Sequence, residues 1–129
     1  MVSMESYRGS DFRSDRDLLV SLLQHARSDA LNSVCRDASC TDAAPHGVHI
    51  TSTAYTVFEG GSYVAGAAQN QVFEASPAVT PSGLTDVVFE PATGDVLVPN
   101  VTPGTISLMG NGHTSDITID SEGQISWTN

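Results

Sequence analysis

Apolar residues recur at every fourth position between Asp15 and Val34, the spacing that places them on one face of an amphipathic helix. No proline or glycine interrupts this segment. We therefore predict a helix over residues 15–36, preceded by residues 1–14 as an added leader or as the start of the same helix. The apolar stripe consists of Leu18, Leu22, Ala26, Ala30 and Val34, widened by Leu19, Leu23 and Leu31.

The polar residues of this segment predict where the helix begins and which of its faces is solvated. Ser14 or Asp15 is placed to cap the first turn by accepting backbone N–H groups. Asp17 follows in the first turn, where the helix dipole favours a negative charge. The face opposite the apolar stripe is expected to lie in water, and it carries Arg16, Gln24, Arg27 and Asp29.

After Cys40 the pattern changes to short runs of β-branched and aromatic residues separated by turn residues, which predicts a β-rich head over residues 47–129. Ile117 and Ile119 flank Thr118, so this strand presents one apolar and one polar face, as in an antiparallel sheet packed on one side. The predicted strands are Val48–Thr51, Tyr55–Glu59, Tyr63–Val64, Gln71–Ala75, Asp86–Glu90, Val96–Val98, Thr105–Met109, Ile117–Asp120 and Gln124–Trp127.

Three glycine-containing segments are typical of hairpin connections, which use the positive φ that glycine adopts. They are Glu59–Gly61, Ala92–Asp95 and Asp120–Gly123.

The chain of 129 residues has the length of one domain. The predicted fold is α+β, a single domain of residues 1–129 in which an N-terminal amphipathic helix packs on an antiparallel β domain. The aromatic residues expected in its core, in preference to a ligand platform, are Tyr55, Phe58, Phe73, Phe89 and Trp127.

Charge is distributed unevenly along the chain. The formal net charge is −10, there is no lysine, and the five basic residues are arginines that lie between Arg8 and Arg36. The region after Arg36 carries acidic residues only. Affinity for nucleic acid depends largely on Lys and Arg side chains that neutralise phosphates. We therefore expect neither nucleic acid nor an anionic membrane to bind the later region.

Cys35 and Cys40 are the two cysteines of the chain. A disulfide between them would close a small loop and would place the protein in an oxidising, extracytoplasmic compartment. Their spacing matches neither a CxxC redox motif nor a zinc site. Two free thiols in a reduced cytosolic protein are the alternative.

The sequence predicts no catalytic, cofactor-binding or metal site. His46 and His49 are separated by an odd number of residues, which would place them on opposite faces of a strand and make them a poor metal pair. Together with His113 they are expected to be surface or loop residues. No nucleophile elbow, HExxH helix or phosphate-binding glycine loop occurs. The acidic residues around the last hairpin fit no EF-hand spacing; they are Asp116, Asp120 and Glu122.

The order of several motifs resembles that of the type II secretion minor pseudopilin GspH and the related FimT-like minor pilins. Leu22–Ala30 is similar to the "L…ARxxA" stretch that follows the family's hydrophobic N-terminal helix, and Pro45–Ile50 resembles the strand that opens its β domain. Two later segments resemble its "F-x-P-x-x-G" and closing "I-x-I…G-x-I" hairpins, through Phe89, Pro91 and Gly94 and through Ile117, Thr118, Ile119, Gly123 and Ile125. The resemblance covers about residues 16–127.

This resemblance implies a pilin-like head of two sheets, carried by a long N-terminal helix whose upstream half lies in the membrane. It implies a structural subunit that acts in the assembly or at the tip of a type IV pilus or type II secretion-like filament, with no active site and no cofactor. Its partners would be other pilin or pseudopilin subunits, bound through the helix, and secretion or assembly proteins. The full-length protein would be extracytoplasmic, anchored in the inner membrane or part of a surface or periplasmic filament.

Two departures from the family pattern affect these expectations. The prepilin-peptidase signature and the hydrophobic half of the helix are not in this sequence. We therefore expect its start to be a truncation point, and we expect any membrane contact to come through that missing helix. DNA-binding FimT-like pilins carry arginines around the final hairpin, whereas Gln124 follows Gly123 here and no basic residue comes after it.

Two other functions remain open: a free extracytoplasmic domain that binds a ligand or surface, and a small hydrolase that uses the histidines or the acidic cluster.

Overall fold

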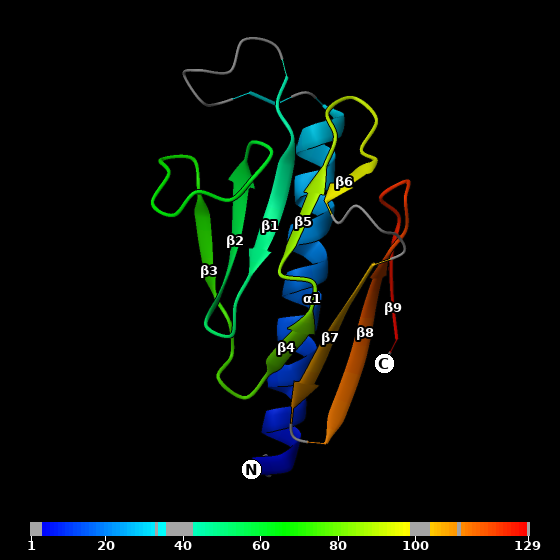
Figure 1. The fold of residues 1–129 in the computed structure, drawn as a ribbon. Coiled ribbons are helices and arrows are strands. Elements are labelled where there is room, and N and C mark those ends of the chain that lie inside the picture. The colour runs from blue at the N-terminus through cyan, green and yellow to red at the C-terminus, as the bar shows by residue number, and fades with distance from the viewer. Residues whose placement is uncertain (1–3, 33, 36–42, 99–103, 111, 129) are drawn as a thin grey trace.

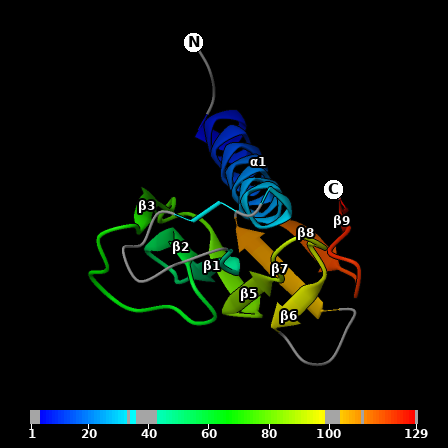
Figure 2. The ribbon, with the colours of Figure 1, turned by 90° about the horizontal axis from the view of Figure 1, so that it is seen from above.

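The computed structural model describes residues 4–32, 34–35, 43–98, 104–110 and 112–128 (Figure 1). In these residues one helix precedes the strands of two antiparallel sheets, so the predicted α+β layout is confirmed. Both sheets lie on the same side of the helix, as the view along it shows (Figure 2). The helix contacts strands of both sheets and therefore joins them into one packed unit.

The helix α1 spans Met4–Leu31, so residues 4–14 form the start of the same helix, which is one of the two predicted alternatives, and the helix ends earlier than the predicted range of 15–36. The apolar stripe itself does not indicate this start, because a polar residue, Asp15, occupies a buried position about one turn after the buried Phe12 and interrupts the stripe. Ser14 and Asp15 consequently lie inside the helix, and the prediction that one of them caps its N-terminus is wrong.

Backbone hydrogen bonds close the C-terminal end of α1. The N–H of Val34 donates to the carbonyl of Asp29 at 3.0 Å, a 6→1 bond of the kind that ends many helices. The N–H of Ala92, from a later loop, donates to the carbonyl of Ala30 at 2.9 Å. These donors satisfy carbonyl groups that a helix leaves unpaired at its last turn.

The face of α1 expected in water is partly covered. Asp29 is buried, and its Oδ2 lies 3.3 Å from Nε2 of His25. Arg16 and Arg27 are half-buried, whereas Gln24 is exposed as expected. The prediction failed for Arg27 and Asp29 because later hairpins fold over the last turns of the helix, which the helical pattern alone does not indicate.

The first sheet has five strands in the order β3-β2-β1-β5-β6, and each neighbouring pair is antiparallel. Val48 in the central strand pairs with Val57 on one side and with Val87 on the other, and all three belong to the core beneath α1. The strand bounds are β1 His46–Ile50, β2 Ala54–Glu59, β3 Gln71–Glu74, β5 Asp86–Phe89 and β6 Val96–Val98.

The second sheet has four antiparallel strands in the order β4-β7-β8-β9. Its two long strands alternate as predicted: Ile106 pairs with the buried Ile117 on the helix side, while Ser107 pairs with the exposed Asp116 on the other side. The strand bounds are β4 Thr80–Gly83, β7 Gly104–Gly110, β8 His113–Ile119 and β9 Ile125–Trp127.

The predicted strands overlap observed strands except at Tyr63–Val64, which lies in the loop between β2 and β3. The pattern does not predict β4, because Thr80–Gly83 reads Thr-Pro-Ser-Gly and proline is tolerated only at a sheet edge. The hairpins at Ala92–Asp95 and Asp120–Gly123 are confirmed. Glu59–Gly61, in contrast, begins a long loop, so its prediction as a tight hairpin is wrong.

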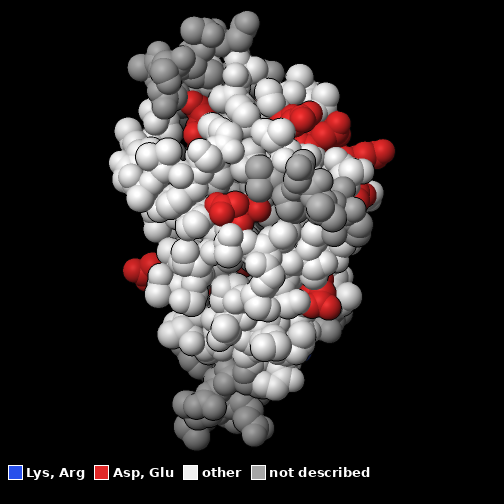
Figure 3. All heavy atoms as spheres, viewed as in Figure 1, with Lys and Arg blue, Asp and Glu red and all other residues white. Residues whose placement is uncertain are grey.

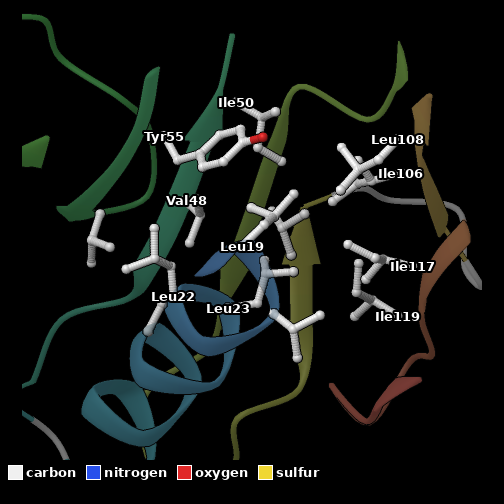
Figure 4. Packing of buried hydrophobic residues seen from close by; sticks show 14 of the residues in the cluster. Leu19, Leu22, Leu23, Val48, Ile50, Tyr55, Ile106, Leu108, Ile117 and Ile119 are labelled. Carbon is white, nitrogen blue, oxygen red and sulfur yellow. The ribbon is translucent and has the colours of Figure 1, made fainter. Parts of the chain in front are cut away.

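The core lies between α1 and the inner faces of both sheets (Figure 4). Tyr55 is fully buried there, and its hydroxyl donates to the carboxylate of Asp15, whose other oxygen accepts the N–H of Ser76 at 2.9 Å. Burial raises the pKa of Tyr55 above its usual range, and the hydrogen bond to Asp15 and the charge of Asp15 raise this pKa further. The buried polar position in the helix is therefore satisfied by partners from two later segments.

The predicted aromatic core is confirmed for Tyr55, Phe58 and Phe89, which are buried. Phe73 is half-buried, and the prediction is wrong for Trp127, which is 44% exposed at the end of the edge strand β9.

The front of the molecule shows acidic side chains and no Lys or Arg in its described part (Figure 3). Among the described residues, no helix is long and apolar enough to span a membrane.

Candidate functional site

The outer face of the five-stranded sheet, meaning the face turned away from α1, is apolar at its centre. Gly47 of β1 lies beneath the side chains of Phe58 and Val88, which are both buried. An added Cβ at Gly47 would lie 2.7 Å from Cζ of Phe58 and 3.0 Å from Cγ2 of Val88, closer than van der Waals contact allows. This sheet is thus packed on both faces, in contrast to the one-sided packing that the sequence predicts for the strand containing Thr118.

His49 and Asp86 lie opposite each other on β1 and β5 of this outer face. Nδ1 of His49 is 2.7 Å from Oδ1 of Asp86, and Oδ2 of Asp86 accepts the hydroxyl of Thr85 at 3.2 Å. The two side chains are 23% and 34% exposed. Because an ionised carboxylate only accepts hydrogen bonds, Nδ1–H of His49 is the donor in this contact.

The loop between β2 and β3 folds over this pair. The ring of Tyr63 stacks on His49 with centroids 3.9 Å apart and an interplanar angle of 4°. Phe58 meets Tyr63 edge-on, at 5.9 Å and 69°. Aromatic contacts of both kinds are favourable beyond the area that they bury. The three rings therefore hold the loop against the sheet.

A cavity of about 280 Å³ lies between this loop and the sheet. Phe58, Val88 and Tyr63 form its apolar and aromatic walls, His49 and Asp86 provide its polar side, and Gly61 and Ser62 line it from the loop. Concave sites with mostly apolar walls and a few convergent polar groups are typical of ligand binding. This cavity is consequently the best candidate for a functional site in the described part of the chain.

The His49–Asp86 arrangement also occurs where a histidine activates a nucleophile, which must lie within hydrogen-bond reach of the ring. Ser62 lines the same cavity, but the described structure contains no hydrogen bond between Ser62 and His49. Tyr63 covers one face of the imidazole. The described geometry therefore shows a histidine–carboxylate pair that lines a cavity.

The histidines considered as metal ligands lie apart. His46 and His49 belong to opposite faces of β1, as predicted from their spacing. The expectation that both are surface or loop residues is wrong, since His46 is 1% exposed and its Nε2 lies 2.8 Å from the carbonyl of Val34. His113 is exposed as expected, and its ring stacks on Phe12 at 5.5 Å.

Asp116 and Asp120 accept hydrogen bonds from neighbouring residues of the four-stranded sheet and its last turn. Oδ1 of Asp120 accepts the N–H groups of Glu122 at 3.0 Å and Gln124 at 2.9 Å, which orders the turn. Oδ1 of Asp116 accepts the hydroxyl of Ser107 at 2.7 Å. No three His, Cys, Asp or Glu side chains gather into a metal-binding group in the part of the chain that the structure describes.

Cys35 follows the end of α1, is half-buried and takes part in a disulfide. Its predicted partner, Cys40, lies outside the described residues, so the Cys35–Cys40 pairing stays a prediction. Peptide mapping without a reducing agent tests it: the two cysteines are expected in one cross-linked peptide. Two separately alkylated cysteines would contradict the pairing.

Sequence reasoning did not single out Asp86 or Tyr63. His49 and Asp86 are 37 positions apart, and only the pairing of β1 with β5 places them together. Tyr63 was assigned to a strand, whereas its position in a loop is what brings it over His49. A glycine in a strand, Gly47, was the available signal, because such a residue often marks close approach of other groups.

No protein-family model, no curated protein and no solved structure matches the chain. The resemblance to GspH and FimT-like pilins therefore rests on the motifs of the sequence.

Proposed function

We propose that the protein is a structural subunit of the minor pilin or pseudopilin type, which acts in the assembly or at the tip of a type IV pilus or type II secretion-like filament. The observation that carries this proposal is the convergence of the resembling motifs at the C-terminal end of α1. These motifs come from separate segments of the sequence, and each is degenerate by itself. Their meeting in space gives them one role, which is to hold both sheets on the helix.

Two glycines of these motifs close on the last turns of α1. A Cβ at Gly94 would lie 2.9 Å from Cγ of Leu31, and a Cβ at Gly123 would lie 2.8 Å from Nε of Arg27. Both glycines have positive φ, 71° and 84°. Nη2 of Arg27 also donates to the carbonyl of Glu122 at 3.3 Å. Neither turn has room for a side chain at its glycine.

The helix side of this junction uses the small residues of the "ARxxA" stretch. Ala26 and Ala30 are both fully buried, and their size allows the sheets to approach the helix closely. The N–H of Val96 in β6 donates to the carbonyl of Ser121 at 3.1 Å, which links the first sheet to the last hairpin of the second. The C-terminal end of α1 thus contacts turns that belong to both sheets.

In the proposed protein, α1 continues upstream into an apolar segment. Figure 2 shows its N-terminal turns leaning away from the sheets, an orientation that suits such a continuation. That segment would anchor the subunit in the inner membrane and would pack against the helices of other subunits in the filament. The head would be extracytoplasmic and would contact secretion or assembly proteins. Neither an enzymatic activity nor nucleic-acid binding belongs to the proposal.

The native reading frame immediately upstream of Met4 tests the proposal. We expect a short basic leader, a processing glycine and about 20 apolar residues that contain a glutamate and run into α1. A conventional cleaved signal peptide, or a native start at this point, would contradict the filament role.

The cavity on the outer face favours a second candidate, a free extracytoplasmic domain that binds a ligand or a surface. This function expects an ordinary signal peptide and a domain that is monomeric and active alone. The same determination of the upstream sequence therefore separates the two candidates.

A further inference from the structure

We propose that the cavity on the outer face of the five-stranded sheet binds an arginine side chain presented by a partner protein. This inference goes beyond the filament role and does not depend on it, because a free binding domain would contain the same cavity. It rests on the size of the cavity, on its charge and on its aromatic walls.

The size of the cavity limits the ligand. Its volume of about 280 Å³ lies below the roughly 300–1,000 Å³ of pockets that enclose drug-sized molecules. A volume of this size suits one long side chain. Gly61 and Ser62 line the cavity from the loop.

The charge of the cavity selects a cation. Asp86 is the acidic residue of its lining, and His49 and Thr85 orient both oxygens of its carboxylate. The chain has no Lys or Arg after Arg36, and the partner that the structure gives this carboxylate is His49, which carries a positive charge only when it is protonated. A cation compensates for the desolvation of Asp86 by direct attraction to its carboxylate, whereas an anion would be repelled.

The aromatic walls favour arginine over lysine. A guanidinium is planar and weakly hydrated, and it stacks on aromatic rings while donating hydrogen bonds to a carboxylate. The ammonium of lysine is a compact ion that loses more hydration in such a place. Tyr63 and Phe58 provide the rings, and the oxygens of Asp86 provide the acceptors.

A titration followed by NMR tests the proposal with two probes of nearly equal shape, Nα-acetyl-arginine methylamide and its citrulline analogue. Citrulline replaces the guanidinium by a neutral urea, so the comparison isolates the charge. We expect the arginine probe to shift the amide resonances of Gly61, Ser62 and Val88, and to bind at least about tenfold more tightly than the citrulline probe. Equal affinities of the two probes would overturn the proposal, whatever any variant does.

Two variants, each of which removes one negative charge from a different position, then locate the site. Asp86→Asn is expected to weaken binding of the arginine probe at least about tenfold, since it removes the acceptor charge in the cavity. Glu74→Gln is the matched control, because Glu74 is exposed on β3 of the same sheet. It is expected to change the affinity less than about twofold. Equal losses in both variants would show a general effect of surface charge and would overturn the site. An upstream pilin leader can still be present in that case, so the two proposals fail separately.

Discussion

The two sheets share one helix but differ in their outer faces. In the four-stranded sheet, Ser107 and Asp116 alternate with the buried Ile106 and Ile117, and the face away from α1 is polar. In the five-stranded sheet, the outer face contains the buried Phe58 and is covered by the loop between β2 and β3. The four-stranded sheet needs only the helix to complete its packing, whereas the five-stranded sheet needs a loop in addition.

This difference indicates where a binding site can form. A strand face that alternates strictly leaves its polar side to water and encloses nothing. A face covered by a loop is enclosed, and any mismatch between loop and sheet remains as a cavity. The cavity beside Tyr63 is such a space, and the paired His49 and Asp86 provide its polar groups.

The largest expected effect compares the two outer faces directly. Phe58→Ala is expected to lower the free energy of unfolding by about 3–5 kcal/mol, because it removes a ring that is 2% exposed and leaves a void. Met109→Ala is the control on the four-stranded sheet, where the side chain is 49% exposed, and it is expected to cost less than about 0.5 kcal/mol. Denaturant unfolding of both variants measures the contrast. Similar losses would mean that the two faces are packed alike.

The next expected effect compares the loss of unfolding free energy at the glycines of two turns of the four-stranded sheet. Gly123→Ala is expected to cost about 2–4 kcal/mol, because it combines positive φ with a Cβ placed 2.8 Å from Nε of Arg27. Gly112→Ala has a similar φ of 81° but no neighbouring atom within 4 Å, so only about 1 kcal/mol is expected from backbone strain. Thermal or denaturant unfolding distinguishes them. Equal costs would place the last hairpin away from the helix.

On the inner face of the five-stranded sheet, Tyr55→Phe is expected to cost about 1–3 kcal/mol, because the buried Asp15 loses its hydroxyl partner. The variant also isolates a pH dependence. The pKa of Tyr55 is raised on folding, so its contribution is fully present below the ordinary tyrosine pKa of about 10 and is lost as the pH rises above it.

Melting temperatures of the wild type and of Tyr55→Phe between about pH 8 and pH 11 test this sign, given the ordinary tyrosine pKa of about 10. The wild type is expected to lose its advantage over the variant as the pH rises. An advantage that stays constant across this range would contradict the raised pKa.

The smallest expected effect concerns the loop cover of the outer face. Tyr63→Leu keeps an apolar residue but removes the stacking on His49, and it is expected to cost about 0.5–1.5 kcal/mol. Val64→Ala is the control in the same loop, with a side chain that is 60% exposed, and a cost below about 0.5 kcal/mol is expected. Denaturant unfolding of the pair decides whether the ring stack holds the loop.

Much of the fold follows from local patterns. The spacing of Leu19, Leu23 and Ala26 predicts the buried face of α1, and the alternation around Thr118 predicts the packing of β8. The elements that failed lack such a signal. Thr80–Gly83 has no apolar residue, and Asp15 is a polar residue in a core position, which its sequence neighbours do not explain.

The candidate site was largely beyond prediction. His49 was weighed as a metal ligand and expected at the surface, and neither Asp86 nor Tyr63 was singled out. The reason is that strand pairing joins His49 to Asp86, and a turn of the loop brings Tyr63 onto His49. These contacts depend on the register of strands distant in sequence, and no periodicity within one strand encodes that register.

The sequence by itself determined the α+β class, the apolar face of the helix and the acidic character of a head without basic residues. These properties depend on composition and on local periodicity, which hold for any arrangement of the elements. Only the tertiary structure decided that Asp15 is buried against Tyr55, that Gly94 and Gly123 close on the end of α1, and that a loop encloses a cavity over the first sheet. The physical reason is that each of these features is a contact between distant segments, which forms only when both sheets pack on one helix.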